Sequence, residues 1–186
     1  MCCPLHGGHC PCDRPAGLRG GEAAQMAKLS AGLLPYRITD DGALTVLLVH
    51  PGGPLWHNKD AHAWSIPKGE YQAGEDPAEA AEREFQEELG LPVPDGRRIP
   101  LGTIRQASGK QVQAWAVRTA DLDPDSFVSN CFEMEWPPKS GIRQEFPEVD
   151  RAEWMSVAQA TRRLVRAQVE LLSRLEDALR DERPGA

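Results

Sequence analysis

The segment Gly69–Leu91 has the sequence GEYQAGEDPAEAAEREFQEELGL, and it combines a complete helix signal with a dense group of acidic side chains. Asp76 is a favourable N-cap, and Pro77 suits the first position of a helix. Gly90 is a natural C-terminal stop. The sequence therefore predicts a helix that begins at Pro77 and ends at Leu89.

One face of this expected helix is acidic. Glu84, Glu87 and Glu88 fall within an arc of about 100°, and the neighbouring apolar face would pack on a sheet. Carboxylates at this spacing repel one another unless a cation lies among them. The alternative is an ordinary solvated acidic face, but such faces usually alternate with basic residues, and only Arg83 is available here. Oxygen ligands suit a hard cation, Mg²⁺ or Mn²⁺, which would be shared with a polyphosphate ligand.

The segment resembles the Nudix box, G-x5-E-x7-R-E-U-x-E-E-x-G-U with U apolar. It matches at every fixed position: Gly69, Glu75, Arg83, Glu84, Phe85, Glu87, Glu88, Gly90 and Leu91. The resemblance implies a hydrolase of nucleoside diphosphates linked to another moiety. It also implies an α/β fold, the α/β/α sandwich of that family, with a mixed β-sheet and a loop–helix–loop metal site.

The resemblance also implies roles for residues of the helix. Glu84 and Glu88 would be the main metal ligands. Glu87 would be a further ligand or would polarise the attacking water. Arg83 would orient the carboxylates through an ion pair, although a plain surface ion pair worth under about 1 kcal/mol is the alternative.

Residues around the helix receive roles in the same way. Gly69 would allow a tight loop, and a backbone carbonyl of Lys68 or Gly69 would contact the metal. The Lys68 side chain is the leading candidate for a phosphate contact, and Glu75 would hold the loop against the helix. Family members often recruit another carboxylate as metal ligand or general base. Glu145 and Glu148 are the candidates, each with a solvated loop acid as its alternative.

Substrate recognition is less closely defined by the sequence. The stretch WSIPKG before the box resembles asymmetric dinucleoside tetraphosphate hydrolases and some nucleotide-sugar enzymes. Trp56, Trp64 and Tyr71 could stack on a base or belong to the core, and His50 or His57 could touch phosphate. Four basic residues could neutralise a long polyphosphate or form ordinary surface charge: Arg105, Lys110, Lys139 and Arg143.

The remaining pattern predicts strands before and after the helix. They are expected over residues 29–38, 44–50, 102–106, 111–118, 127–136 and 149–155, with a loop over 137–147. Apolar residues then recur at helical spacing over 157–179, which predicts one long amphipathic C-terminal helix. The segments WSIPKGE, SNCFEMEWPPKSG and QEFPEVDRAEW resemble predicted bacterial NTP pyrophosphohydrolases of the same family.

Composition excludes several classes of protein. The chain has 186 residues, of which 40% are hydrophobic, enough for one domain with one core. No apolar run approaches the roughly 20 residues that span a bilayer, and the N-terminus lacks the features of a secretory signal. A net charge of −7 disfavours general nucleic-acid binding. We therefore expect a cytoplasmic protein without membrane contact.

The cysteines are concentrated at the N-terminus. Together with two histidines they could bind zinc: Cys2, Cys3, His6, His9, Cys10 and Cys12. We instead expect residues 1–26 to be a disordered leader rich in Cys, Gly and Pro, with Met26 as a plausible alternative start. The Nudix domain is expected over residues 27–182, with Cys131 as a small buried hydrophobe.

These observations predict Mg²⁺- or Mn²⁺-dependent cleavage of a pyrophosphate bond in a nucleoside or dinucleoside polyphosphate. The partner would be a small nucleotide or, among nucleic acids, only a capped RNA end, and the protein would be a monomer or a homodimer. The alternative function is a non-catalytic nucleotide sensor with the same fold. Loss of glutamates from the box would mark such a sensor, and this box is intact.

Overall fold

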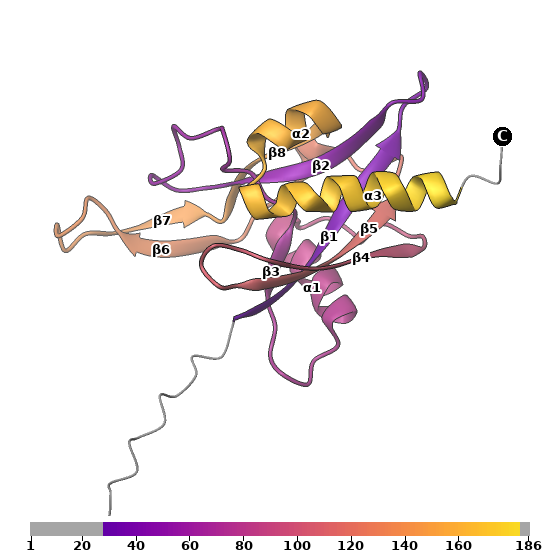
Figure 1. Ribbon diagram of the computed structural model, residues 1–186. Coiled ribbons are helices and arrows are strands. Elements are labelled where there is room, and N and C mark those ends of the chain that lie inside the picture. Colours follow the sequence, from indigo (N-terminus) through magenta and orange to yellow (C-terminus); the bar gives the residue numbers. More distant parts are fainter. Residues whose placement is uncertain (1–27, 183–186) are drawn as a thin grey trace, which may run out of the picture.

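The structure is a computed structural model that describes residues 28–182, so the predicted leader and its zinc-binding alternative lie outside the described residues. Figure 1 shows strands and helices arranged around one main sheet. In chain order the elements are β1 (Leu29–Ile38), β2 (Leu44–Pro51), β3 (Lys68–Glu70), α1 (Pro77–Leu89), β4 (Arg98–Arg105), β5 (Gln111–Arg118), β6 (Cys131–Glu135), β7 (Arg143–Pro147), β8 (Val149–Ser156), α2 (Val157–Arg163) and α3 (Val169–Asp181).

The main sheet is mixed and is centred on β1. Its strand order is β4-β5-β1-β2-β8, with β3 paired to β1 beside this path. Only β1 and β5 run parallel to each other; the other pairs are antiparallel. One edge of β1 is divided, because residues 30–32 pair with β3 while residues 36–38 pair with β2. β2 and β3 therefore separate from each other beside β1.

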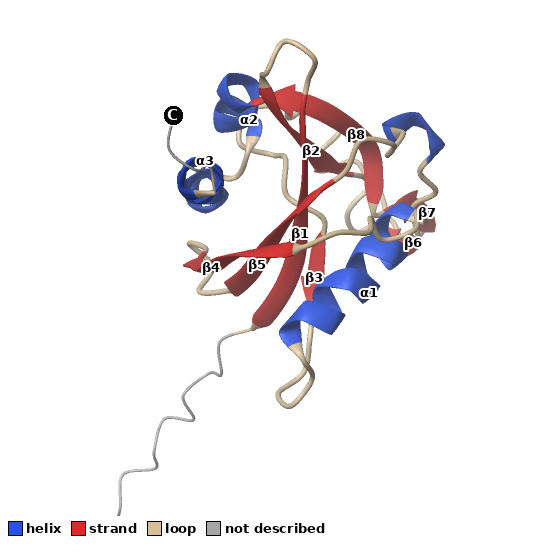
Figure 2. Cartoon of the chain, turned by 90° about the vertical axis from the view of Figure 1, so that its right-hand side faces the viewer, coloured by secondary structure: helices blue, strands red, loops and turns tan. Residues whose placement is uncertain are grey.

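Helices cover both faces of this sheet, as Figure 2 shows with α1 on one side and α2 and α3 on the other. On the α1 side, Phe85 and Leu89 pack against alternate residues of β1 and β2. On the opposite side, Leu171 and Leu175 of α3 pack with residues from β1, β4 and β5. The α/β/α sandwich with a mixed sheet is confirmed. Among residues 28–182, no helix is both long enough and apolar enough to cross a membrane.

The prediction of one long C-terminal helix was wrong. The chain leaves the helix at Leu164, whose backbone is extended at φ −60° and ψ 143°. A 3₁₀ turn follows over Arg166–Gln168, and α3 begins at Val169. The interruption lets Leu164 bridge to Trp64, and the Gln168 side chain accepts a hydrogen bond from the Ile66 amide. Both helices bury their apolar residues in the same core. The helical spacing of apolar residues therefore continues across the break and gives no sign of it in the sequence.

The region after β5 also differs from the prediction. β6 begins only at Cys131, and the expected loop over 137–147 contains β7, which pairs with β6 in a separate two-stranded ribbon. Figure 1 shows this ribbon extending away from the main sheet. Residues of β6 alternate between exposed and half-buried, and Cys131 is exposed. The prediction that Cys131 is buried was therefore wrong, because Cys131 lies on the exposed face of a two-stranded ribbon that extends away from the main sheet.

Candidate active site

The helix that carries the acidic residues begins and ends as its sequence predicts. Asp76 accepts hydrogen bonds from the backbone N–H groups of Ala78 and Glu79, at 2.8 and 3.2 Å. Pro77 stands in the first turn, and Gly90 ends the helix in the left-handed region at φ 62°. These signals fix the ends of α1, while burial of Ala81 and its apolar neighbours against the sheet sets the rotation of the helix and turns Glu84 and Glu88 toward β3.

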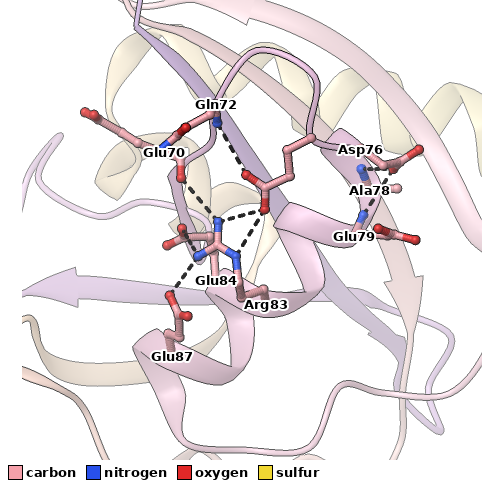
Figure 3. Close-up of polar contacts among 9 residues, drawn as sticks. Glu70, Gln72, Asp76, Ala78, Glu79, Arg83, Glu84 and Glu87 are labelled. Atoms are coloured by element: carbon pink, nitrogen blue, oxygen red, sulfur yellow. Dashed lines mark hydrogen bonds and ion pairs between the residues drawn. The ribbon is translucent and has the colours of Figure 1, made fainter.

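Arg83 joins the loop to the helix. Its Nη1 lies 2.6 Å from Glu84 Oε1 and 2.9 Å from Glu87 Oε2. On the loop side, Nη2 lies 3.2 Å from Glu75 Oε1 and donates to the Glu70 carbonyl oxygen at 3.4 Å. Figure 3 shows the guanidinium at the centre of this network. Arg83 therefore orients two carboxylates of α1 while Glu75 ties the loop to the helix.

Gly69 is required by the position of Glu84. A Cβ atom built on Gly69 would lie 1.5 Å from Glu84 Oε2, far inside van der Waals contact. The backbone of β3 and the Glu84 carboxylate can therefore approach each other only without a side chain at this position. The Glu84 carboxylate is partly buried there, and burial raises its pKa above the ordinary value.

Glu88 is the most perturbed carboxyl group of the site. The backbone N–H of Lys68 donates to its Oε2 at 2.9 Å. Burial raises the pKa of Glu88 to about 7, although the Lys68 ammonium opposes this shift, and the charges of Glu84 and Glu148 add to it. A divalent cation would offset both the desolvation of the ionised Glu88 carboxylate and its repulsion by the neighbouring carboxylates.

The structure distinguishes between the two predicted acids outside the helix. Glu148 lies where β7 gives way to β8, and its charge contributes to the raised pKa of both Glu84 and Glu88. Glu145 is exposed on β7 and pairs across the two-stranded ribbon with Glu133. The fold therefore brings Glu148 to the carboxylates of α1 and does not bring Glu145 there.

A cleft of about 260 Å³ opens beside these carboxylates, where β2 and β3 separate. Trp56 forms part of its wall with 37% of its surface exposed, and the Lys59 ammonium lies 4.7 Å from the centre of the Trp56 ring. Burial lowers the pKa of Lys68, which also lines the cleft. The lining residues are Val49, Pro51, Trp56, Ala63, Ser65, Lys68, Glu88, Gln106, Glu148, Val149 and Val165.

Two of the predicted substrate contacts lie in the interior. Trp64 is fully buried, and its Nε1 donates to Asp60 Oδ1 at 2.7 Å, so no ring face is open to a base. His50 is also fully buried, with Nδ1 2.6 Å from Asp150 Oδ1 and Nε2 2.6 Å from the Lys59 carbonyl oxygen. The structure therefore does not present either side chain to a ligand.

The other predicted substrate contacts lie outside the cleft. Tyr71 packs against the core on the α1 side and does not line the cleft, and His57 is exposed. Lys110 pairs with Glu70 at 3.2 Å, and Arg143 pairs with Glu133 on the ribbon at 3.0 Å. Arg105 and Lys139 are exposed and do not line the cleft either.

Sequence reasoning missed most of the cleft wall, including one residue from a turn and one from the break in the C-terminal helix. Gln106 comes from the turn between β4 and β5, and Val165 comes from the break between α2 and α3. No local pattern marks either residue. They reach the cleft only because the sheet and the interrupted C-terminal helix bring their loops together.

The donor set fits a hard divalent cation, although it is not a preformed cage. Within residues 28–182, no three His, Cys, Asp or Glu side chains are already gathered as ligands around one point. Glu84 Oε1 is instead engaged by Arg83. The partly buried carboxylates of Glu84 and Glu88, with that of Glu148 beside them, nevertheless supply the oxygen ligands that Mg²⁺ and Mn²⁺ prefer.

Comparison with known proteins agrees with this geometry. The family model for the NUDIX domain matches residues 28–175. The chain is 36% identical over 101 residues to an octanoyltransferase of Myxococcus xanthus, and 38% identical over 65 residues to an RNA pyrophosphohydrolase of Rhodospirillum rubrum. These alignments cover 54% and 33% of this chain, but only 25% and 37% of the respective relatives.

A solved structure shares the fold. A Caenorhabditis elegans Ap4A hydrolase in a binary complex superposes with a TM-score of 0.58 and 23% sequence identity. The superposition covers 82% of this chain and 98% of the hydrolase. The intact box, the sandwich around it and the extent of the family match lead to one conclusion: the chain belongs to the Nudix family.

Proposed function

We propose that this protein hydrolyses a pyrophosphate bond in a nucleoside or dinucleoside polyphosphate, with Mg²⁺ or Mn²⁺ as cofactor. One observation carries the proposal: Glu88 and Glu148 line one cleft with Lys68 and Trp56, and the charge of Glu148 adds to the raised pKa of both Glu84 and Glu88. The Nudix family generally uses divalent cations. Two similar proteins, an Ap4A hydrolase and an RNA pyrophosphohydrolase, support a phosphate anhydride as the target.

In this proposal each side chain has a defined task. Glu84, Glu88 and Glu148 would hold the cation, together with a backbone carbonyl of Lys68 or Gly69. When bound, the cation supplies neutralisation of the charge that develops on the phosphates. The Lys68 ammonium contacts a phosphate oxygen in a poorly solvated wall of the cleft, where its charge acts strongly.

The remaining tasks are to orient the carboxylates, to polarise a water molecule and to bind the nucleobase. Arg83 keeps Glu84 and Glu87 aligned, because its guanidinium bridges both. Glu87 is about half exposed at the outer edge of this network, where it can polarise a water molecule. The Trp56 ring offers a partly exposed face on which a nucleobase can stack.

The proposal is tested by comparing Glu88→Gln with Glu79→Gln. Both substitutions remove a carboxylate from α1, but Glu79 is an exposed first-turn residue outside the cleft. Turnover would be followed as phosphate released by an added coupling enzyme, inorganic pyrophosphatase for nucleoside triphosphates and phosphatase for nucleotide sugars, ADP-ribose and dinucleoside polyphosphates, each with and without Mg²⁺. Loss of one electrostatic contact of this kind should lower kcat at least about 100-fold in Glu88→Gln, with little change in Glu79→Gln.

Two results would contradict the proposal. Near wild-type turnover in folded Glu88→Gln would show that Glu88 does not hold the cation. No turnover of any substrate by folded wild-type protein that binds Mg²⁺ would favour the nucleotide sensor instead.

A further inference from the structure

A second hollow adjoins the cleft and has no role in the proposal so far. It measures about 500 Å³, and its walls include His62, Ala107, Ser108, Arg166 and Ala167. Gln106 and Val165 line both this hollow and the cleft with the carboxylates. A ligand held at Glu88 can therefore extend across Gln106 and Val165 into the second space, which we call the outer lobe.

The outer lobe has the chemistry of a nucleoside site. Ala107, Val165 and Ala167 provide apolar surface for the face of a base, while the Gln106 amide and the Ser108 hydroxyl can pair with its polar edge. Within residues 28–182, the side chains of Gln106 and Ser108 make no hydrogen bond in the protein, so both remain available to a ligand.

The charge of the lobe also points to a phosphate neighbour. Arg166 is exposed on the 3₁₀ turn, and no carboxylate in the described part of the chain forms an ion pair with it. Its planar guanidinium can bind phosphate oxygens through two hydrogen bonds. By contrast, nearby Arg163 is fully engaged with Asp60 and Glu153.

The cleft therefore offers one set of nucleoside-binding features, the Trp56 ring with Lys59 against it, and the outer lobe offers a second set, Gln106 with Arg166. We infer that the outer lobe receives the second nucleoside of a dinucleoside polyphosphate, with Arg166 on the phosphate next to it. This inference rests on the proposed function and narrows its substrate class. A substrate with a single nucleoside would leave one of the two sets without a ligand.

The test compares two substrates that share an adenosine tetraphosphate part: P1,P4-diadenosine tetraphosphate, and adenosine 5′-tetraphosphate, in which a free terminal phosphate replaces the ester to the second nucleoside. Arg166→Ala removes the free guanidinium, and Ala107→Trp fills the lobe from an exposed turn. Each variant should lower the ratio of kcat/KM for the dinucleotide to that for the mononucleotide by about tenfold, mainly through KM of the dinucleotide. Arg162→Ala is the matched control, because Arg162 is exposed on α2 and does not line the lobe.

The outcomes separate the two proposals. A fall in the ratio in both lobe variants, with Arg162→Ala unchanged, supports the second nucleoside site. Active wild-type enzyme whose ratio is the same in all variants overturns the lobe inference and leaves the proposed hydrolysis intact. Wild-type protein that cleaves neither compound in Mg²⁺, nor any other nucleotide of the wider panel, overturns the proposed function itself.

Discussion

Glu88 lines the cleft, and its burial there is a cost to the fold. Its folded pKa of about 7 exceeds the ordinary value of 4.5, so the folded protein binds more protons than the unfolded chain between these pH values. Stability therefore falls as the pH rises through this window when no divalent cation is present. The difference between the two pKa values, about 2.5, corresponds to at most about 3.4 kcal/mol.

This cost predicts a pH-dependent gain from Glu88→Gln. In the presence of a metal chelator, the variant should unfold at a higher temperature than wild type at pH 8, because glutamine cannot ionise but can still accept the Lys68 hydrogen bond. The gain should shrink toward pH 5, where Glu88 is protonated. Thermal unfolding at several pH values measures it, with Glu79→Gln as control. A gain that is constant with pH would show that ionisation of Glu88 is not its cause.

A second prediction concerns Gly69→Ala. The added methyl group would overlap the Glu84 carboxylate, which is the mobile end of a side chain and can swing away without unfolding the sheet. We expect a folded protein with at least about tenfold weaker Mg²⁺ binding and reduced turnover. Calorimetric titration and circular dichroism would measure the two properties. Unchanged Mg²⁺ affinity would contradict the placement of Glu84 as a ligand.

Among the elements, the loop that carries Trp56 is tied down by a buried histidine. His50, near the end of β2, joins the Lys59 carbonyl oxygen in the loop to Asp150 at the start of β8. Each ring nitrogen of His50 lies 2.6 Å from one oxygen atom, so the ring contacts both segments at once. The contact thereby links the Trp56 wall of the cleft to the strand that begins beside Glu148.

This link predicts that Asp150→Ala loosens the loop. Removal of the acceptor should cost about 1–3 kcal/mol, because a buried ring nitrogen loses its partner. Amide hydrogen exchange over residues 52–62 should accelerate, and KM should rise more than kcat falls. Asp150→Asn keeps an acceptor oxygen and should show smaller changes. Equal exchange in wild type and Asp150→Ala would show that the link does not restrain the loop.

The sequence predicted the bounds of some helices correctly and those of others incorrectly. The bounds of α1 were predicted correctly because its cap, first-turn proline and terminal glycine are all local signals. The C-terminal helix was predicted as one piece because α2 and α3 bury the same apolar face. Its break depends on distant partners, the Trp64 bridge and the Ile66 hydrogen bond, which no local pattern contains.

For the molecule as a whole, bound cations should stabilise the fold. A ligand that binds only the folded state at 100 times its Kd adds about 2.7 kcal/mol. Mg²⁺ should therefore raise the Tm of wild type, and this increase should be lost in Glu88→Gln but retained in Glu79→Gln. A wild-type Tm that does not respond to Mg²⁺ would contradict the metal site.

Ca²⁺ allows cation binding at the site to be measured separately from substrate turnover. It should also raise the Tm of wild type, because the same carboxylate oxygens can bind it, but it should support little hydrolysis. Its coordination is looser than that of Mg²⁺ and does not hold the reacting groups in line. Parallel thermal and kinetic measurements would test this. Comparable rates in the two ions would count against the proposed site.

The sequence by itself determined the family resemblance, the sandwich fold and the acidic face of α1. The acidic face of α1 depends on caps and residue spacing within one short segment, and the sandwich followed from the family resemblance of that segment together with the order of the expected strands and helices. Only the tertiary structure decided which distant groups join that face. It selected Glu148 over Glu145, buried Trp64 and His50, and brought in Gln106. Strand order and loop packing fix such long-range neighbours, and neither is encoded in any local pattern.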